Sequence, residues 1–233
     1  MDDEKLVEYA AALGIHIDGG KARLLCDYGE AVARQNERIN LTAKVCGEVF
    51  LIRHLLDSLT AAAPDEVFGN VVDIGTGGGF PGVAVKVLKP ECRVTLVDAT
   101  GKKLAAVTRI CAWLGIEVET LHARAEQLGA VEYRGQFDAV TARAVARLPI
   151  LLEYCLPLLR VGGALVAMKG AAAEAETAQS EEALKTLGGE VKYIKHFQLP
   201  DRSERRIVVV SKTCPTPEGF PRAQKMIARR PIE

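Results

Sequence analysis

The sequence lacks the features that mark several large classes of protein. Its 233 residues carry 30 basic and 30 acidic side chains. The chain therefore lacks the overall positive charge that is typical of many nucleic-acid-binding proteins. It has no apolar run of about 18 residues, which argues against a membrane span. Its acidic start, MDDEKLVEYA, has no apolar stretch of the kind found in secretory signals. We therefore expect no membrane association.

The cysteines lack the spacing of a metal or redox site. They stand at positions 26, 46, 92, 111, 155 and 214, and no two of them form a C-x-x-C pair. Several lie in apolar-periodic stretches, as buried reduced thiols do, and such thiols indicate a cytoplasmic protein. No cluster of His, Cys and carboxylate residues has metal-ligand spacing either, so we predict no metal ion.

Seven short β-like runs are present from residue 70 onward, separated by helical patterns. They lie at residues 70–74, 92–98, 117–122, 137–142, 163–169, 190–199 and 205–211. Several are apolar almost throughout, which is typical of strands buried on both faces of a parallel sheet. The alternation predicts right-handed crossovers and a doubly wound, mostly parallel, seven-stranded Rossmann-like α/β sheet. The last two strands should pair antiparallel, because the PDRSE connection is too short for a parallel crossover.

Residues 1–65 have helical rather than β-like patterns. Leu24, Leu25, Tyr28 and Val32 form one apolar stripe, and the segment 49–62 predicts a second amphipathic helix. We therefore expect an N-terminal helical cap over residues 1–65, packed on a core domain of residues 66–233. Within that core, the segment AEAETAQSEEALKTLG predicts one further helix.

The first strand is followed by a loop rich in glycine. VVDIGTGGGFPG, residues 71–82, contains five glycines, and backbone without Cβ atoms lets a ligand approach closely. Gly75 follows the strand directly, and Gly77 and Gly79 leave room for a ribose or a charged tail. Asp98 ends the second strand, where a carboxylate can accept both hydroxyls of a ribose. The pattern favours an adenosine-containing cofactor over a plain β-α turn.

Two adenosine cofactors fit this pattern. Gly77, Gly79 and Gly82 form a G-x-G-x-x-G motif, which is typical of NAD sites. That motif should open at the strand end, however, and the Phe-Pro pair before Gly82 crowds the helix N-terminus that a pyrophosphate needs. The D-x-G-x-G-x-G spacing from Asp73 instead resembles S-adenosylmethionine-dependent methyltransferases. An NAD-dependent oxidoreductase, or a non-catalytic RNA-binding or assembly protein with a relic cofactor fold, stays as an alternative.

The resemblance extends along essentially the whole chain to one family. The segments in question, in order, are NERINLTA (36–43), IRHLLDSL (52–59), VVDIGTGGGFPG (71–82), VDATGKK (97–103), HARAEQL (122–128), DAVTARAVA (138–146), LVAMKG (165–170) and ERRIVVV (204–210). Together they resemble the bacterial RsmG family, also called glucose-inhibited division protein B. That family methylates N7 of a guanine in small-subunit ribosomal RNA. The C-terminal segment FPRAQKMIARRPIE resembles the family's basic motif only loosely.

The resemblance implies a cofactor, a partner and a set of site residues. The cofactor is S-adenosyl-L-methionine, and the partner is 16S ribosomal RNA, within the small subunit or an assembly intermediate; we expect a monomer. The implied cofactor-binding residues are Gly75, Gly77, Phe80, Asp98, Ala99, Thr100, Ala125, Glu126 and Arg143. The implied substrate-handling and catalytic residues are Arg143, Asn40, His54, Asp57 and Arg205. His54 and Asp57 share a polar helix face at i, i+3, which fits a solvated face and a site equally well.

Two other methyltransferase chemistries lack their motifs here. Methylation of an amino nitrogen typically uses D/N-P-P-Y/F after the fourth strand, and methylation of cytosine C5 needs a cysteine there, but the chain reads TARAV. Guanine N7 has a free lone pair, so its methylation needs neither a general base nor a covalent intermediate. Catalysis can then depend on positioning and electrostatics.

Charge is unevenly distributed in spite of the overall balance. Residues 202–230 carry eight Lys or Arg side chains against Glu204 and Glu218. Such a basic C-terminal region can dock a polyanion locally, or it can be an ordinary solvated surface.

Overall fold

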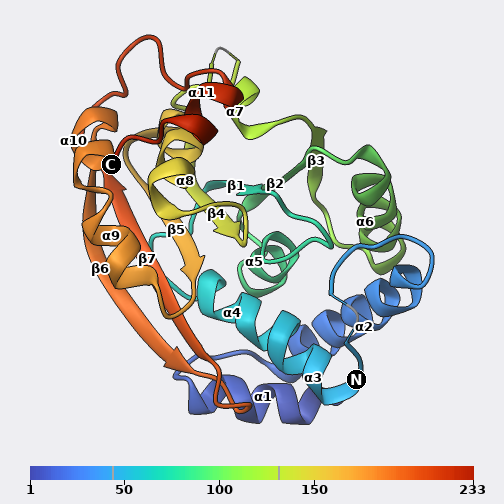
Figure 1. Cartoon of the computed structure of the whole chain (residues 1–233). Helices are drawn as coiled ribbons and strands as arrows, with labels where there is room; N and C mark the ends of the chain where they lie inside the picture. The colour runs from blue at the N-terminus through green and yellow to red at the C-terminus, as the bar shows by residue number, and fades with distance from the viewer. Residues whose placement is uncertain (44, 131) are drawn as a thin grey trace.

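One seven-stranded sheet forms the centre of the computed structural model, which describes residues 1–43, 45–130 and 132–233. The strand order is β3-β2-β1-β4-β5-β7-β6 (Figure 1). The strands are β1 Asn70–Ile74, β2 Arg93–Asp98, β3 Glu119–His122, β4 Phe137–Arg143, β5 Leu159–Lys169, β6 Gly189–Gln198 and β7 Glu204–Lys212. Every expected strand is present, with ends shifted by a few residues.

The strand directions confirm the doubly wound topology. Strands β1 to β5 pair in parallel, and β7 pairs antiparallel with both β5 and β6. The chain moves outward from β1 to β3 and then returns to place β4 on the other side of β1. In such a sheet, the switch point between β1 and β4 is where ligands bind, beyond the carboxyl ends of the strands.

Helices cover both faces of the sheet. They are α1 Asp3–Ala12, α2 Gly19–Asn36, α3 Gly47–Phe50, α4 Asp57–Ala62, α5 Gly82–Leu88, α6 Gly101–Leu114, α7 Ala125–Leu128, α8 Leu148–Cys155, α9 Ala173–Ala178, α10 Glu181–Leu187 and α11 Gln224–Arg229. Successive strand residues point to opposite faces: Val71 packs with the N-terminal helices, α5 and α6, and Val72 packs with α8 and α10. Both faces of the sheet are therefore buried, which explains the nearly continuous apolar runs.

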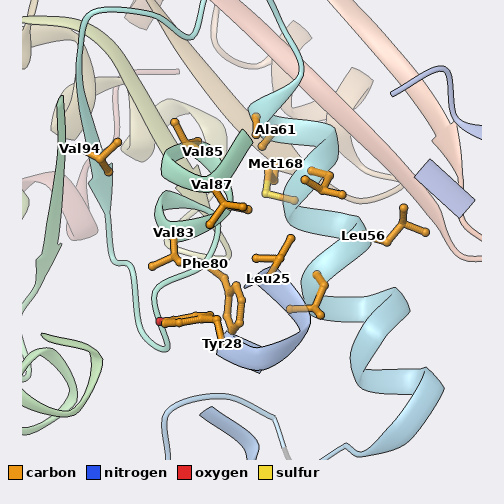
Figure 2. Packing of buried hydrophobic residues seen from close by; sticks show 14 of the residues in the cluster. Leu25, Tyr28, Leu56, Ala61, Phe80, Val83, Val85, Val87, Val94 and Met168 are labelled. Atoms are coloured by element: carbon orange, nitrogen blue, oxygen red, sulfur yellow. The ribbon is translucent and has the colours of Figure 1, made fainter. Parts of the chain in front are cut away.

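The N-terminal helices share one hydrophobic cluster with the sheet. Leu25 and Tyr28 of α2 and Leu56, just before α4, pack with Phe80 and with Met168 of β5 (Figure 2). Figure 1 shows α1 to α4 gathered on one side of the molecule. The cluster is continuous across residue 65. The division into a helical cap and a core domain at that residue stays a prediction.

Two expected helices differ from the prediction. The segment 49–62 is not one regular helix: a π-helical turn, Leu51–Leu56, separates α3 from α4. The segment AEAETAQSEEALKTLG is divided into α9 and α10, and Ser180 lies between them. The Ser180 hydroxyl donates to the Glu176 carbonyl at 2.6 Å, a local bond that competes with the helical pattern.

Four cysteines are buried, two are exposed (Cys46 and Cys214), and all six are free thiols. Within the described ranges, no helix combines the length and the apolar character needed to cross a membrane.

Candidate active site

The glycine loop between β1 and α5 needs its glycines for backbone reasons. Gly75, Gly77 and Gly79 have φ values of 70°, 56° and 85°, in the left-handed region that favours glycine. A Cβ atom at Gly75 would lie 2.7 Å from the Val145 side chain, and one at Gly79 would overlap the Tyr28 hydroxyl. The loop is therefore pressed between the segment after β4 and helix α2.

A buried carboxylate holds the base of this loop. Asp73, the fourth residue of β1, accepts the Gly82 N–H at 3.0 Å and the Thr141 hydroxyl at 2.9 Å. Burial raises the pKa of Asp73 to about 6, although these hydrogen bonds oppose the shift. Asp73 thus ties β1 to β4 and to the start of α5.

A second carboxylate lies at the surface of the same loop. One oxygen of Asp98, the last residue of β2, accepts the Gly77 N–H at 2.9 Å, and the other accepts the Thr100 N–H at 2.8 Å. The side chain is half-buried, and each carboxylate oxygen has two lone pairs. Asp98 can therefore hold the loop and still accept hydrogen bonds from the hydroxyls of a ribose.

The N–H groups of the loop test the NAD alternative. A pyrophosphate binds free N–H groups at a helix N-terminus. Five N–H groups of this turn already donate to protein acceptors, namely those of Thr76, Gly77, Gly79, Phe80 and Gly82. Pro81 has none to offer. The geometry therefore fits an adenosine cofactor without a pyrophosphate better than a dinucleotide.

The remaining expected cofactor residues lie beside this loop. Asp98 pairs in register with His122, whose Nε2 lies 3.0 Å from the Ala99 carbonyl oxygen. Ala99 and Thr100 are exposed, and Ala125 and Glu126 are half-buried at the start of α7. The fold brings these segments to one edge of the sheet, and their contact with a cofactor stays a prediction.

A buried polar cluster lies behind the loop, at the end of β4. Asp57 accepts the Arg205 Nε–H at 2.9 Å and lies 3.4 Å from Arg143 Nη1. Arg143 Nη2 also lies 3.3 Å from His54 Nδ1. His54 is 7% exposed and Asp57 is 3% exposed, so the shared polar face of these residues is not solvated.

The contacts assign the protonation state of His54. A guanidinium has no acceptor, so Nδ1 must accept the bond from Arg143, and Nε2 carries the proton near the Thr42 hydroxyl at 3.0 Å. Burial lowers the pKa of His54 to about 4, and the positive charge of Arg143 adds to this effect. At neutral pH the imidazole is uncharged.

Asp57 lies between opposing influences. Burial raises the pKa of Asp57 above its ordinary value, although Arg143 and Arg205 oppose this shift. The two guanidiniums at bonding distance keep the carboxylate ionised at neutral pH. His54, Asp57, Arg143 and Arg205, which we call the polar cluster, therefore carry two positive charges and one negative charge.

The turn after α2 contributes residues that sequence reasoning missed. Asn36 Oδ1 accepts the N–H groups of Leu41 at 2.7 Å and Thr42 at 3.0 Å, which places the Thr42 hydroxyl against His54. Asn40, which the resemblance implied as a substrate residue, is exposed and does not line the cavity beside the polar cluster. Within NERINLTA, Asn36 holds the turn and Thr42 contacts His54, and a substrate role for Asn40 stays a prediction.

Phe80 connects the loop with the polar cluster. Its ring is 2% exposed, stacks on His54 with centroids 5.6 Å apart, and has the Arg143 guanidinium 5.4 Å from its centroid. Tyr28 meets the same ring edge-on at 5.6 Å (Figure 2). Phe80 thus faces the polar cluster, and its contact with a cofactor stays a prediction.

A cavity of about 710 Å³ opens beside the polar cluster. His54, Asp57, Arg143 and Arg205 all line it, as does Val145, which touches Gly75. Its opposite wall is formed by the ends of β5 and α9. There Glu176 accepts the Lys169 ammonium at 2.8 Å and the Leu148 N–H at 2.7 Å. The cavity is large enough for a nucleobase.

The family model described as GidB, rRNA small subunit methyltransferase G, matches residues 21–208. The ribosomal RNA small subunit methyltransferase G of Roseiflexus sp. (strain RS-1) is 40% identical over 98% of this chain and 99% of its own length. That of Desulfitobacterium hafniense (strain Y51) is 42% identical over 94% and 93%.

The chain belongs to the rRNA small subunit methyltransferase G family. The family suggested by the sequence motifs is confirmed, and the protein is an enzyme, a methyltransferase. Among solved structures, ribosomal protein L11 methylase from Lactobacillus delbrueckii subsp. bulgaricus superposes with a TM-score of 0.53 at 19% identity, covering 68% of this chain and 78% of that protein. This likeness confirms the Rossmann-like methyltransferase fold alone.

The basic C-terminal region of this family member is partly occupied by internal contacts. Lys212 is buried and donates to the Leu187 carbonyl at 2.6 Å; burial lowers its pKa to about 8. Arg222 pairs with the buried Glu153 at 2.6 Å. Lys212 and Arg222 are therefore not free to meet a polyanion. The exposed basic side chains beyond Arg222 are those of Lys225, Arg229 and Arg230.

A metal ion would need several His, Cys, Asp or Glu side chains close together. Across residues 1–43, 45–130 and 132–233, no group of three or more His, Cys, Asp or Glu residues is arranged to hold a metal ion. A metal-free site stays a prediction.

Proposed function

We propose that the protein transfers a methyl group from S-adenosyl-L-methionine to N7 of a guanine in 16S ribosomal RNA. The observation that supports this proposal most directly is the polar cluster, which lines the cavity beside the glycine loop. None of its side chains is available to accept a proton at neutral pH. His54 is neutral with Nδ1 already bonded, and Asp57 is paired with two guanidiniums. Such a site suits a nucleophile that needs no deprotonation.

The glycine loop and the loops after β2 and β3 support the cofactor assignment. Gly75, Gly77, Phe80, Asp98–Thr100, Ala125, Glu126 and Arg143 are the residues proposed to hold it. When bound, S-adenosyl-L-methionine supplies a methyl group on a positively charged sulfur. Asp98 accepts ribose hydroxyls in this proposal, and the Gly75 backbone allows close approach.

The cavity is proposed to receive a guanine that has left its stack. Enzymes that modify bases extrude the target nucleotide into a pocket. Arginine is the usual partner of the guanine O6 and N7 edge. We assign the remaining N–H donors of Arg143 and Arg205 to O6 and to nearby phosphate oxygens, which leaves the N7 lone pair free for methylation.

The electrostatics of the cavity support the same chemistry. N7 methylation adds positive charge to the ring, and the Asp57 carboxylate lies in the cavity wall where it can partly offset that charge. A protonated His54 would oppose the reaction, and burial beside Arg143 prevents protonation. Positioning and electrostatics then supply the rate enhancement. Asn40, which is exposed, is retained only as a candidate RNA contact.

The cellular setting belongs to the same proposal. The substrate would be 16S ribosomal RNA within the small subunit or an assembly intermediate, and the enzyme would act as a cytoplasmic monomer. The reduced thiols support this compartment, since all six cysteines are free.

Methyl transfer from labelled S-adenosyl-L-methionine tests the proposal. Purified protein would be incubated with 16S ribosomal RNA and with small subunits that have never been methylated, and digested nucleosides would be identified by mass spectrometry. N7-methylguanosine is the expected product. An Arg143→Ala variant should bind the cofactor more weakly and lose most transfer, whereas Arg93→Ala, at an exposed ion pair with Glu119, should match the parent. Another methylated nucleoside, or none, would contradict the proposal; titration with NAD tests the dehydrogenase alternative.

A further inference from the structure

A second hollow lies between α2 and α6, away from the polar cluster. Its volume is about 670 Å³. It is lined on the α2 side by Ala31, Arg34, Gln35, Glu37 and Arg38, and on the α6 side by Ala106, Arg109, Ile110 and Trp113. The two helices pack against each other, and Figure 1 shows them side by side at one flank of the molecule. None of the residues implied by the family resemblance lies in this hollow.

The side chains that line the hollow have a net positive charge, in a chain of balanced charge. Arg34, Arg38 and Arg109 face one acidic side chain, Glu37. Helix α6 contains no acidic residue at all, and Lys102 and Lys103 in its first turn add further positive charge. Arg34 pairs only loosely with Glu30, at 3.7 Å, and in the described part of the chain Arg38 and Arg109 make no ion pair. These charges are open to an external anion.

A single large aromatic side chain stands at one end of the hollow. Trp113 is the only tryptophan of the chain and is 69% exposed, more than any other large apolar residue described. An indole ring beside arginines is a platform on which a nucleobase can stack while its phosphates meet the guanidiniums.

The position of the hollow connects it with the candidate active site. Helix α6 begins at Gly101, directly after Asp98–Thr100 at the catalytic edge of the sheet. Trp113 lies twelve residues further along, about 18 Å down the helix axis at 1.5 Å per residue. The Asn36–Thr42 turn leads from the α2 side of the hollow to His54. A strand that enters the catalytic cavity can therefore continue along this flank.

We infer that the hollow between α2 and α6 is a docking surface for single-stranded RNA, with Trp113 stacking a base and Arg34, Arg38 and Arg109 contacting phosphates. This inference rests on the proposed function, because it concerns the same RNA outside the reacting nucleotide. An acidic protein would satisfy the arginines, but it would leave the exposed indole without a planar partner. Charge and stacking together favour nucleic acid.

The lone tryptophan makes the surface directly observable. The full-length protein would be titrated with a ten-nucleotide oligoadenylate while Trp113 fluorescence is recorded, at several salt concentrations. We expect quenching on binding. Trp113→Leu should weaken RNA binding, measured by anisotropy of labelled RNA, about 5- to 150-fold. Arg38→Ala with Arg109→Ala should flatten the slope of log affinity against log salt by about 1.4.

A charge-matched control separates local contact from net charge. Arg93→Ala with Lys185→Ala also removes two exposed cations, from β2 and α10, and should leave quenching and slope unchanged. Equal slopes for all variants, or no quenching, would overturn the surface. Binding of polyglutamate as strong as binding of RNA would also overturn it, in favour of an acidic protein partner.

The outcome is distinguishable from that of the proposed function. Quenching by RNA in a protein that shows no methyl transfer would support the surface and contradict the proposed activity. Unaltered RNA binding in the variants, together with normal N7 methylation, would contradict the surface and leave the activity standing. In the expected case, Trp113→Leu raises the KM for RNA, leaves kcat unchanged, and leaves cofactor affinity the same.

Discussion

The two halves of the catalytic edge are built in different ways. The half after β1 and β2 is a contiguous loop plus one carboxylate, held by local bonds such as Gly77 N–H to Asp98 at 2.9 Å. The half after β4 is a buried cluster whose members come from residues 54, 57, 143 and 205. In the first half Gly75 is exposed and Gly77 and Asp98 are half-buried, whereas His54 and Asp57 of the second half are buried.

Because of this difference, substitutions in the polar cluster should mainly change the stability of the protein, and substitutions in the loop half should mainly change ligand binding. Removing a group from the loop half changes what a ligand can contact but leaves little buried charge unpaired. Removing a group from the polar cluster leaves an uncompensated charge inside the protein, which is costly whether or not a ligand is present. The predictions below test that contrast.

Asp57→Ala should have the largest effect. The change leaves Arg143 and Arg205 without their shared carboxylate, and side chains of these arginines are only 18% and 25% exposed. Breaking a buried pair costs about 3–5 kcal/mol, so the free energy of unfolding, measured by urea denaturation, should fall by about that amount.

The matched control for Asp57 removes a carboxylate from an exposed pair. Glu119→Ala separates Glu119 from Arg93, which lies 3.2 Å away, and should cost about 0–1 kcal/mol. Similar losses in the two variants would mean that the polar cluster is no more tightly coupled than a surface pair.

His54 should give the next largest effect, seen as a pH dependence. The pKa of His54 falls from 6.5 to about 4 on folding, so between these values the unfolded chain binds a proton that the folded protein excludes. Stability from the neutral ring is complete above pH 6.5 and is lost as pH falls. The loss at pH 4 is about 3 kcal/mol at 1.36 kcal/mol per pH unit.

Comparison with a His54→Gln variant isolates this term. The difference in unfolding free energy between parent and variant should shrink as pH falls from 6.5 to 4, since the variant has no proton to bind there. Asp73 acts in the opposite direction, because its pKa rises to about 6 on folding, but it is present in both proteins and cancels. A difference that stays constant with pH would show that His54 titrates normally.

The loop half follows from the local sequence more directly than the polar cluster does, for a physical reason. Gly75, Gly77 and Asp98 act through backbone conformation and strand-end position, both of which are encoded locally. Their spacing therefore predicts the glycine loop, and the alternation of strands and helices predicts the sheet.

The polar cluster depends on burial, which no local pattern specifies. His54 and Asp57 at i, i+3 fitted a solvated face equally well, and only the packing of the N-terminal helices buries them. The π-helical turn that carries His54 has no separate sequence signal here. The role of Asn36 in holding this turn has no local signal for the same reason, because the turn that directs its amide inward is a tertiary feature.

Asp98→Ala tests the loop half and should affect binding rather than stability. The half-buried carboxylate would lose its proposed hydrogen bonds to the ribose, and charged hydrogen bonds contribute about 1.5–3 kcal/mol. Affinity for S-adenosyl-L-methionine, measured by isothermal titration, should fall about tenfold to a hundredfold, while the urea midpoint changes little. An unchanged dissociation constant would remove Asp98 from the cofactor site. Asp57→Ala, measured where it is folded, should nearly retain cofactor affinity.

The smallest expected effect concerns the exposed arginines of the C-terminal region. Helix α11 is fixed to the core by the buried Ile227 and by the Arg222–Glu153 pair, and Glu233 reaches Arg147 in the wall of the catalytic cavity at 2.9 Å. Arg229 and Arg230 are thus held on the part of the chain that reaches this cavity, where we propose that RNA binds. Each phosphate contact adds about 0.7–0.9 to the slope of log affinity against log salt.

Arg229→Ala with Arg230→Ala should therefore flatten that slope by about 1.4–1.8 and leave cofactor affinity the same. Arg222 is not part of this set, because its guanidinium is already paired with Glu153. RNA affinity would be measured at four or more salt concentrations, with Arg93→Ala plus Lys185→Ala again as the charge-matched control. Parallel lines for parent and variant would show that the C-terminal arginines are solvated, and RNA docking would then depend on the polar cluster and on the surface between α2 and α6.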